Sequence, residues 1–220
     1  MGEDGKSGLE SVRVAKLLRD DIMLGRRMPG SRLVERDLAA ELEVSRLPVR
    51  EAIKVLVAEG IVVARPRSWA TVREFSQQDI NDFAEVRESI ETLAWALATE
   101  RIDDEGLARF ERLIGAEEAA AAAGDVDAAR QASAAVHMAA VELSGNAMLI
   151  ELARSLVTRL RWLFGQHDDL DGMAIRHRTI LEAMRARDVE EVRRLIPKHL
   201  AQGRAAASER LFGRRGSHDA

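Results

Sequence analysis

The chain has 220 residues, 46% of them hydrophobic and 32% charged, which is enough for two modest domains that each bury a core. It contains no cysteine, which excludes disulfides, thiolate metal sites and a cysteine nucleophile, and fits a reducing compartment. No stretch approaches the roughly 20 apolar residues of a membrane span, and the acidic N-terminus lacks the apolar core of a signal peptide. We therefore expect a cytoplasmic protein with no membrane partner.

The net charge of −4 hides a difference between the two parts of the chain. Residues 1–75 carry 14 Lys and Arg against 12 Asp and Glu, so the acidic excess lies in the remainder. Within residues 44–73 the bias is stronger, with six basic residues against two acidic ones. If the protein binds nucleic acid, this segment is expected to bind it.

Three helices and a hairpin are predicted in the first third of the chain. Apolar residues at helical spacing predict a helix over 10–24, and Gly25 is a typical stop. The same pattern predicts a short helix over 35–42 and a third helix capped by Ser45, joined across a tight turn. Residues 61–73 predict two short strands around a loop. This order of elements is that of a winged helix-turn-helix.

The third helix carries the residues that suit DNA. Ser45, Arg46 and Arg50 lie in its first two turns, on the side opposite the apolar Ile53 and Leu56. A helix N-terminus attracts phosphate, and arginine pairs bidentately with guanine edges or phosphate oxygens. The alternative is a solvated helix face whose arginines make local ion pairs.

From Ser76 onward the strand signals end, and the remainder is predicted to be an antiparallel all-helical bundle, so the fold class is mainly α. Three starts carry recognisable caps, because Ser76 precedes Asp79 by three residues and because Asp125 and Asp188 each precede an acidic first turn. The predicted helices cover about 77–100, 104–123, 126–143, 147–165, 172–186 and 189–209.

Two histidines in this part are expected to converge. His177 and His199 lie 11 residues on either side of a turn at Asp188, so in an antiparallel hairpin they sit at the same height. No carboxylate lies near them in sequence, and two buried histidines are costly unless something satisfies their nitrogens.

Arg87 interrupts the apolar stripe of the first of these helices. It is expected either to pair with Glu91 one turn later or to line a cavity, where its fork would suit a carboxylate ligand.

The segment PGSRLVERDLAAELEVSRLPVREAIKVLVAEGIV resembles the DNA-binding domain of the GntR family of bacterial regulators, and the likeness runs from about residue 9 to 74. It implies that Arg36, Arg46 and Arg50 contact operator DNA and that Ser45 contacts a phosphate. The glycine often found near the tip of the wing is replaced by Ser68-Trp69-Ala70, and Trp69 is interpreted as a packing residue.

The segments VHMAAVELSGN at 136–146 and RHRTILEAMRARDVEEVRRLIPKHL at 176–200 resemble the FCD ligand-binding domain of the FadR subfamily, in its shorter, six-helix VanR-like type. This likeness covers about residues 78–212. It implies a divalent metal, of the zinc, nickel or manganese class, held by His137, His177 and His199.

The position of the family's fourth ligand, an aspartate, is occupied by Ser133, whose neutral hydroxyl is a poor ligand. The alternative is a metal-free pocket in which the histidines hold an anion directly. The resemblance also places Arg87, Ser133 and Asn146 at an effector site, although a helix cap is the favoured interpretation of Asn146.

The expected organisation is therefore a flexible N-terminus (1–8), a winged helix-turn-helix (9–74), a linker (75–77), an FCD-like effector-binding and dimerisation domain (78–212) and a flexible tail (213–220). The predicted function is that of a homodimeric repressor that binds double-stranded operator DNA and responds to a small organic acid. Two rivals stay open. One is a constitutive DNA-binding protein with a vestigial pocket, and the other is a histidine–metal hydrolytic enzyme, against which stands the lack of an obvious general base.

Overall fold

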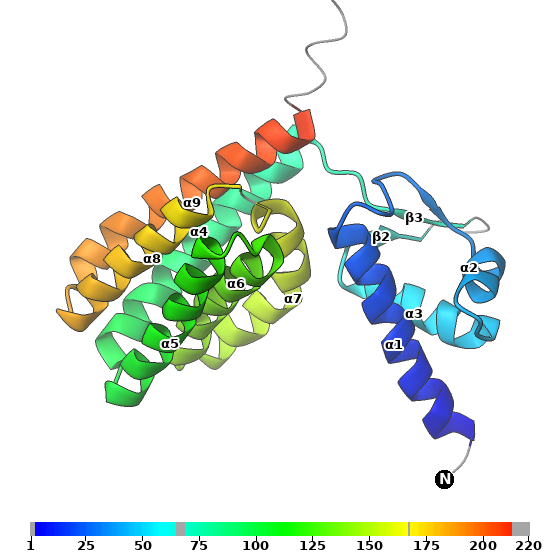
Figure 1. Cartoon of the computed structure of the whole chain (residues 1–220), viewed down its shortest axis with the longest axis horizontal. Coiled ribbons are helices and arrows are strands. Elements are labelled where there is room, and N and C mark those ends of the chain that lie inside the picture. Colours follow the sequence, from blue (N-terminus) through cyan, green and yellow to red (C-terminus); the bar gives the residue numbers. More distant parts are fainter. Residues whose placement is uncertain (1–2, 65–68, 167, 213–220) are drawn as a thin grey trace, which may run out of the picture. The chain divides into compact units, whose positions relative to one another are not determined.

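The computed structural model describes residues 3–64, 69–166 and 168–212. The chain divides between Phe75 and Ser76 into two compact units, which we treat separately. Unit 1 contains the elements α1 (Glu3–Met23), β1 (Arg32–Leu33), α2 (Glu35–Glu41), α3 (Arg46–Ala58), β2 (Val62–Val63) and β3 (Ala70–Val72) (Figure 1). The fold class is the predicted one, mainly helical with a small N-terminal sheet.

The core of unit 1 forms where α1 packs on α3. Val14 and Leu18 of α1 and Val49 and Leu56 of α3 are completely buried, as their helical spacing predicts. Arg19 donates two hydrogen bonds to Glu59, from Nε at 2.8 Å and from Nη2 at 2.5 Å, which ties α1 to the end of α3. The scaffold that carries α3 is thus fixed by burial and by a bidentate ion pair.

The wing sheet differs from the prediction by one strand. β3 is the central strand and pairs antiparallel with both β1 and β2, with Thr71 opposite Arg32 on one side and Val63 on the other. The sequence predicted only the two strands of the hairpin. A two-residue strand such as β1 is too short to show alternation, so only its tertiary neighbour reveals it.

The described residues of unit 2 form helices and the short connections between them, with no strand. Its elements are α4 (Gln77–Arg101), α5 (Asp104–Ala122), α6 (Val126–Leu143), α7 (Ala147–Phe164), α8 (Leu170–Arg185) and α9 (Val189–Phe212). The predicted starts have their caps: Ser76 and Asp79 form a reciprocal capping box, and Asp125 accepts a hydrogen bond from the Ala128 amide. Asp188 accepts one from the Glu191 amide.

The core of unit 2 lies between α4, α5, α6, α8 and α9, with Trp95 and Phe110 at its centre. The two rings lie 5.4 Å apart, and both side chains are fully buried. Trp95 also contacts the rings of His137 and His177, at 6.2 Å and 6.4 Å between centroids. His137 and His177 therefore lie at the edge of the hydrophobic core and pack against it.

Two of the expected segment boundaries lie at the ends of the chain. α1 begins at Glu3, so the helix includes most of the stretch that was expected to be a flexible N-terminus, and residues 1–2 lie outside the described residues. Residues 213–220, the expected tail, also lie outside them. No helix of the described chain is long and apolar enough to cross a membrane.

Candidate functional site

The first candidate site is the exposed face of α2 and α3 in unit 1. Its basic side chains are largely open to solvent, with exposed fractions of 81% for Arg36, 63% for Arg46 and 50% for Arg50. Ser45 occupies the N-cap position of α3, but its side chain makes no cap hydrogen bond, contrary to the expectation that it caps the helix. Its hydroxyl is therefore free for another acceptor or donor.

Glu35, at the start of α2, connects two of these arginines and was not predicted from the sequence. Its carboxylate accepts hydrogen bonds from Arg50 Nε at 3.0 Å and Arg50 Nη2 at 2.9 Å. Arg46 Nη2 lies 3.6 Å from the same carboxylate. The hydrogen bond from Arg50 is the main reason that the pKa of Glu35 lies below its ordinary value, with burial opposing it. Arg36 instead pairs with Asp37, at 3.0 Å.

The wing is only partly described, since residues 65–68 lie outside the described residues, and with them part of the altered tip. Trp69 is 44% exposed, and the guanidinium of Arg32 lies 4.1 Å from the centre of its ring. This stacking of β1 on the wing is a packing contact of the kind interpreted from the sequence.

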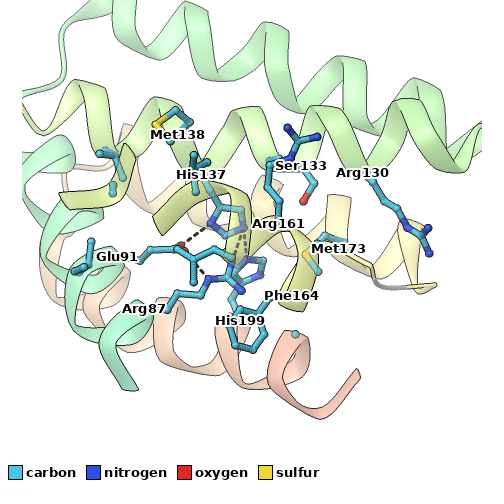
Figure 2. A pocket seen from close by; sticks show the side chains of 18 residues that line it. Arg87, Glu91, Arg130, Ser133, His137, Met138, Arg161, Phe164, Met173 and His199 are labelled. Carbon is cyan, nitrogen blue, oxygen red and sulfur yellow. Dashed lines mark hydrogen bonds and ion pairs between the residues drawn. The ribbon is translucent and has the colours of Figure 1, made fainter. Parts of the chain in front are cut away.

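The second candidate site lies in unit 2, where three helices bring together His137 of α6, His177 of α8 and His199 of α9. One ligand atom from each lies within 4.8 Å of the others. His137 Nε2 and His199 Nε2 are 3.2 Å apart, and the rings of His177 and His199 are separated by 4.6 Å between centroids. Figure 2 shows His137 and His199 facing each other beside Arg87 and Glu91. The two histidines of the α8–α9 hairpin thus converge as their spacing predicts.

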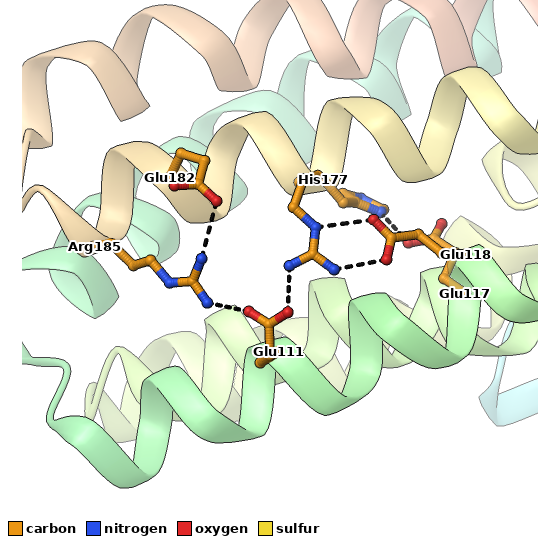
Figure 3. Close-up of polar contacts among 7 residues, drawn as sticks. Glu111, Glu117, Glu118, His177, Glu182 and Arg185 are labelled. Carbon is orange, nitrogen blue, oxygen red and sulfur yellow. Dashed lines mark hydrogen bonds and ion pairs between the residues drawn. The ribbon is translucent and has the colours of Figure 1, made fainter.

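Two glutamates orient these rings. Glu91 Oε2 lies 2.6 Å from His137 Nδ1, and Glu117 Oε2 lies 2.7 Å from His177 Nδ1 (Figure 3). An ionised carboxylate can only accept a hydrogen bond, so Nδ1 carries the proton in both rings, and in the neutral form of each ring Nε2 keeps a lone pair. The expectation of no carboxylate beside the histidines, which rested on proximity in sequence, is wrong in the folded chain.

Burial disfavours the charged form of two of the three histidines, His177 and His199. His177 and His199 are 0% and 4% exposed, and burial lowers the pKa of both, that of His199 well below its ordinary value. Burial by itself would raise the pKa of Glu91, but the charges of Arg87 and His137 outweigh it and hold that pKa far below the ordinary value. The site therefore favours neutral imidazoles at His177 and His199 beside the ionised carboxylate of Glu91.

Several nitrogens of the cluster have no protein partner. His177 Nε2 and His199 Nδ1 are buried and make no hydrogen bond, which is costly for a polar atom. Neutral imidazoles whose opposite nitrogen is bound by a carboxylate are typical metal ligands. The three histidines are therefore the residues that could hold a metal ion in the described chain.

A cavity adjoins the histidines, with about 800 Å³ of space not filled by atoms, including the part open to solvent. His137, His199, Arg87, Glu91 and Ser133 line its polar end (Figure 2). Two more arginines, Arg130 and Arg161, also line it and were missed by the sequence analysis. Much of the remaining wall is apolar, formed by Ile90, Met138, Val141, Val157, Leu160, Phe164 and Met173.

Arg87 meets both sequence expectations at once. It is 9% exposed and lines the cavity, and its Nε donates to Glu91 at 2.6 Å, while its Nη2 lies 3.4 Å from His137 Nε2. Ser133, one turn before His137, is 4% exposed and lines the same cavity. Asn146 lies elsewhere: it caps α7 by accepting from the amides of Met148 and Leu149, and it is not among the described residues that line the cavity.

Glu117 could have been found from the sequence. It continues the buried stripe of α5, after Phe110 and Ile114, at helical spacing. A charged residue on an apolar stripe needs a buried partner, and this is the signal that drew attention to Arg87. Glu35 and the cavity arginines carry no such signal, because exposed charged residues are common on helices.

A winged helix with an exposed basic recognition face, joined in one chain to a helical unit with a polar-ended cavity, defines a class of protein, the DNA-binding transcription regulators with a ligand-binding domain. Residues 10–72 match the family described as bacterial regulatory proteins of the gntR family, and residues 82–202 match the FCD domain. The chain belongs to the GntR family, with a C-terminal FCD domain. It is a transcription regulator and not an enzyme.

Named relatives agree with this assignment. The chain is 30% identical over 165 residues to the Nta operon transcriptional regulator of Aminobacter aminovorans, covering 73% of this chain and 77% of that one. It is 29% identical over 203 residues, 88% of each chain, to the "Probable D-xylose utilization operon transcriptional repressor" of Paenarthrobacter nicotinovorans. The solved structure of McbR/YncC from Escherichia coli superposes with a TM-score of 0.76 at 25% identity, covering 91% of this chain and 98% of that one.

Proposed function

We propose that this regulator is a repressor whose affinity for operator DNA is controlled by a small organic acid. The acid binds in the cavity of unit 2, beside a divalent metal ion that is held by His137, His177 and His199. The observation that carries the proposal is the convergence of these three histidines, two of which, His137 and His199, line the cavity. Repression is favoured because the relative from Paenarthrobacter nicotinovorans is named as a probable transcriptional repressor.

The residues fit a metal ion. Two nitrogens bound to one zinc ion at about 2.0–2.1 Å lie roughly 3.3 Å apart in a tetrahedral site, close to the 3.2 Å between His137 Nε2 and His199 Nε2. His177 Nε2 is buried without a partner, so a metal would satisfy it. When bound, the ion would supply a positive charge with open positions for an anion. Ser133 in place of a carboxylate leaves that charge larger.

The cavity favours an acid with an apolar part. Arg87 is neutralised by Glu91, and Arg130 donates to Gln166 and Asp168, at 3.2 Å and 2.9 Å. Arg161 lines the cavity with an exposed side chain. The carboxylate of the ligand would bind at the histidine end of the cavity or to one of these arginines. The apolar wall of the cavity would cover the rest of the ligand.

The operator contacts are proposed to come from Arg36, Ser45, Arg46 and Arg50. Each is exposed on the α2–α3 face, as a group that reaches DNA must be. Arginines of this kind read guanine edges in the major groove or bind phosphates, and a free hydroxyl at a helix N-terminus suits a phosphate oxygen.

A homodimer is proposed because operators of helix-turn-helix proteins contain two half-sites. Large apolar side chains lie exposed on the neighbouring helices α4 and α7, namely Val86, Leu93, Met148 and Leu152, with exposed fractions of 40–63%. We expect Leu93→Asp with Leu152→Asp to convert the dimer to a monomer, measured as molar mass by light scattering. Val12→Asp, at a more exposed apolar residue of unit 1, is the control. A monomeric wild-type chain would contradict the dimer.

Metal analysis and DNA binding together test the sensing proposal. After loading with Zn²⁺ and dialysis, the wild-type chain is expected to retain about one ion, and His177→Ala to retain none. Met184→Ala, which truncates another fully buried side chain of α8 without removing a donor, is the control and should retain the ion. Equal retention by wild type and His177→Ala would overturn the metal site.

Acetate, succinate and benzoate serve as probe acids for the coupling to DNA. The DNA is a duplex that the wild-type protein selects from a randomised pool. We expect at least one of the acids to change the affinity of the protein for this duplex by about 5–150-fold, the usual size of allosteric coupling. Specific DNA binding that no acid and no metal alters would identify a constitutive binder instead.

A further inference from the structure

We infer that Glu35 is a specificity-determining residue of the DNA-reading face, which holds Arg50 in a single orientation so that one edge of its guanidinium is presented to DNA. This inference rests on the proposed operator contacts of Arg46 and Arg50. Glu35 is not one of the proposed operator contacts. Its negative charge repels phosphates, so a role in raising the affinity for DNA does not explain an acidic side chain at this position.

The geometry around Arg50 supports a fixed orientation. Glu35 accepts from Nε at 3.0 Å and from Nη2 at 2.9 Å, a bidentate pair between two planar groups. A guanidinium has five N–H donors and two edges that can each make a bidentate contact. Glu35 occupies the Nε–Nη2 edge, so the edge formed by Nη1 and Nη2 remains free to pair with guanine O6 and N7 or with a phosphate.

The surroundings of Glu35 explain why it can act in this way. Its own side chain is 28% exposed, whereas Arg50 and Arg46 are 50% and 63% exposed. Glu35 is the first residue of α2, where the helix dipole favours a negative charge. Its backbone is therefore held by a helix that packs on α3, and its carboxylate lies between the two arginines of α3.

Two physical effects follow: the first favours the correct site, and the second lowers the affinity for all DNA alike. A flexible arginine loses side-chain entropy when it binds, so an arginine that is already held loses less and reads the base edge better. A carboxylate beside the DNA face weakens the general attraction to phosphates, which is the part of binding that does not depend on sequence. Glu35 is thus expected to favour the correct site over random DNA.

The test uses the full-length chain, a duplex selected by the wild type from a randomised pool and a scrambled duplex of the same composition. For Glu35→Gln we expect the affinity for the scrambled duplex to rise by about threefold and the ratio of selected to scrambled affinity to fall by about tenfold. Glu51→Gln removes the same charge from α3, where Glu51 accepts a hydrogen bond from Lys54 and makes none to Arg50 among the described residues, and should leave that ratio within about twofold.

A double-mutant cycle separates this inference from the proposed contacts. In an Arg50→Ala background the Glu35→Gln change should no longer lower the ratio, because the group that Glu35 positions is gone. If Arg50→Ala leaves binding of the selected duplex unchanged, the proposed contact fails. If Arg50→Ala weakens binding but Glu35→Gln leaves the ratio unchanged, or raises both affinities equally, the contact stands and the role of Glu35 is overturned.

Discussion

Arg46→Ala combined with Arg50→Ala is expected to lower the affinity for the selected duplex by at least about 30-fold, since each arginine that reads a base edge contributes about 1–3 kcal/mol. The side chains of Arg46 and Arg50 are each at least half exposed on α3, so their removal leaves the core of unit 1 intact. Binding is measured by fluorescence anisotropy over a range of salt concentrations. The salt dependence should become shallower by up to about two charges if both groups also neutralise phosphates.

Lys54→Ala is the matched control for this prediction. Lys54 carries the same charge on the same helix, is 65% exposed and pairs with Glu51 at 2.8 Å. Its removal should weaken binding by no more than a few-fold, equally for selected and scrambled duplexes. A double variant that binds the selected duplex as well as the Lys54→Ala variant does would show that α3 is not the reading helix.

Glu117→Gln is expected to lower the affinity of the regulator for Zn²⁺ by about 10–100-fold, the usual cost of changing a group that orients a metal ligand. Glu117 lies 2.7 Å from His177 Nδ1, and both side chains are almost completely buried. Glutamine can still accept the hydrogen bond, so the ring keeps its orientation, but the loss of the negative charge makes Nε2 a weaker donor to a cation. Competition with a chelator of known affinity measures the change.

Glu118→Gln is the control, because Glu118 is the next residue of α5 and binds the residue next to His177. It accepts from Arg178 Nε at 2.9 Å and from Arg178 Nη2 at 2.6 Å, and Arg178 also donates to Glu111 at 2.5 Å (Figure 3). The side chains of Arg178, Glu111 and Glu118 are 28–42% exposed. Loss of the ion pair between Glu118 and Arg178 should therefore change the zinc affinity by less than about twofold. Equal effects of the two variants would mean that Glu117 acts only through the packing of α5 on α8.

Local patterns in the sequence were sufficient for most of the secondary structure. Ser76, Asp125 and Asp188 cap their helices where the sequence placed them, since a cap depends only on residues within one turn. The short strand β1 was not predicted, because its pairing partner, β3, lies almost 40 residues further along the chain.

The recognition motif was also visible in the sequence, as a basic helix start after a short helix. The ion pair between Glu35 and Arg50 was not visible in the sequence, since it joins residues that are 15 positions apart on two helices. The choice between a free arginine and a paired one depends on how α2 packs on α3. Nothing within a turn of either residue determines that packing.

The histidine cluster shows the same division between sequence and tertiary structure. The sequence by itself determined that His177 and His199 face each other, because a helical hairpin has a fixed rise per residue and its turn was readable at Asp188. Only the tertiary structure decided which carboxylates accompany them. Glu91 lies 46 residues from His137 and Glu117 lies 60 residues from His177, and both approach because the helices that carry them pack around Trp95. Helix periodicity determines which face of a helix is buried, but the neighbour of that face is set by the packing of the whole bundle.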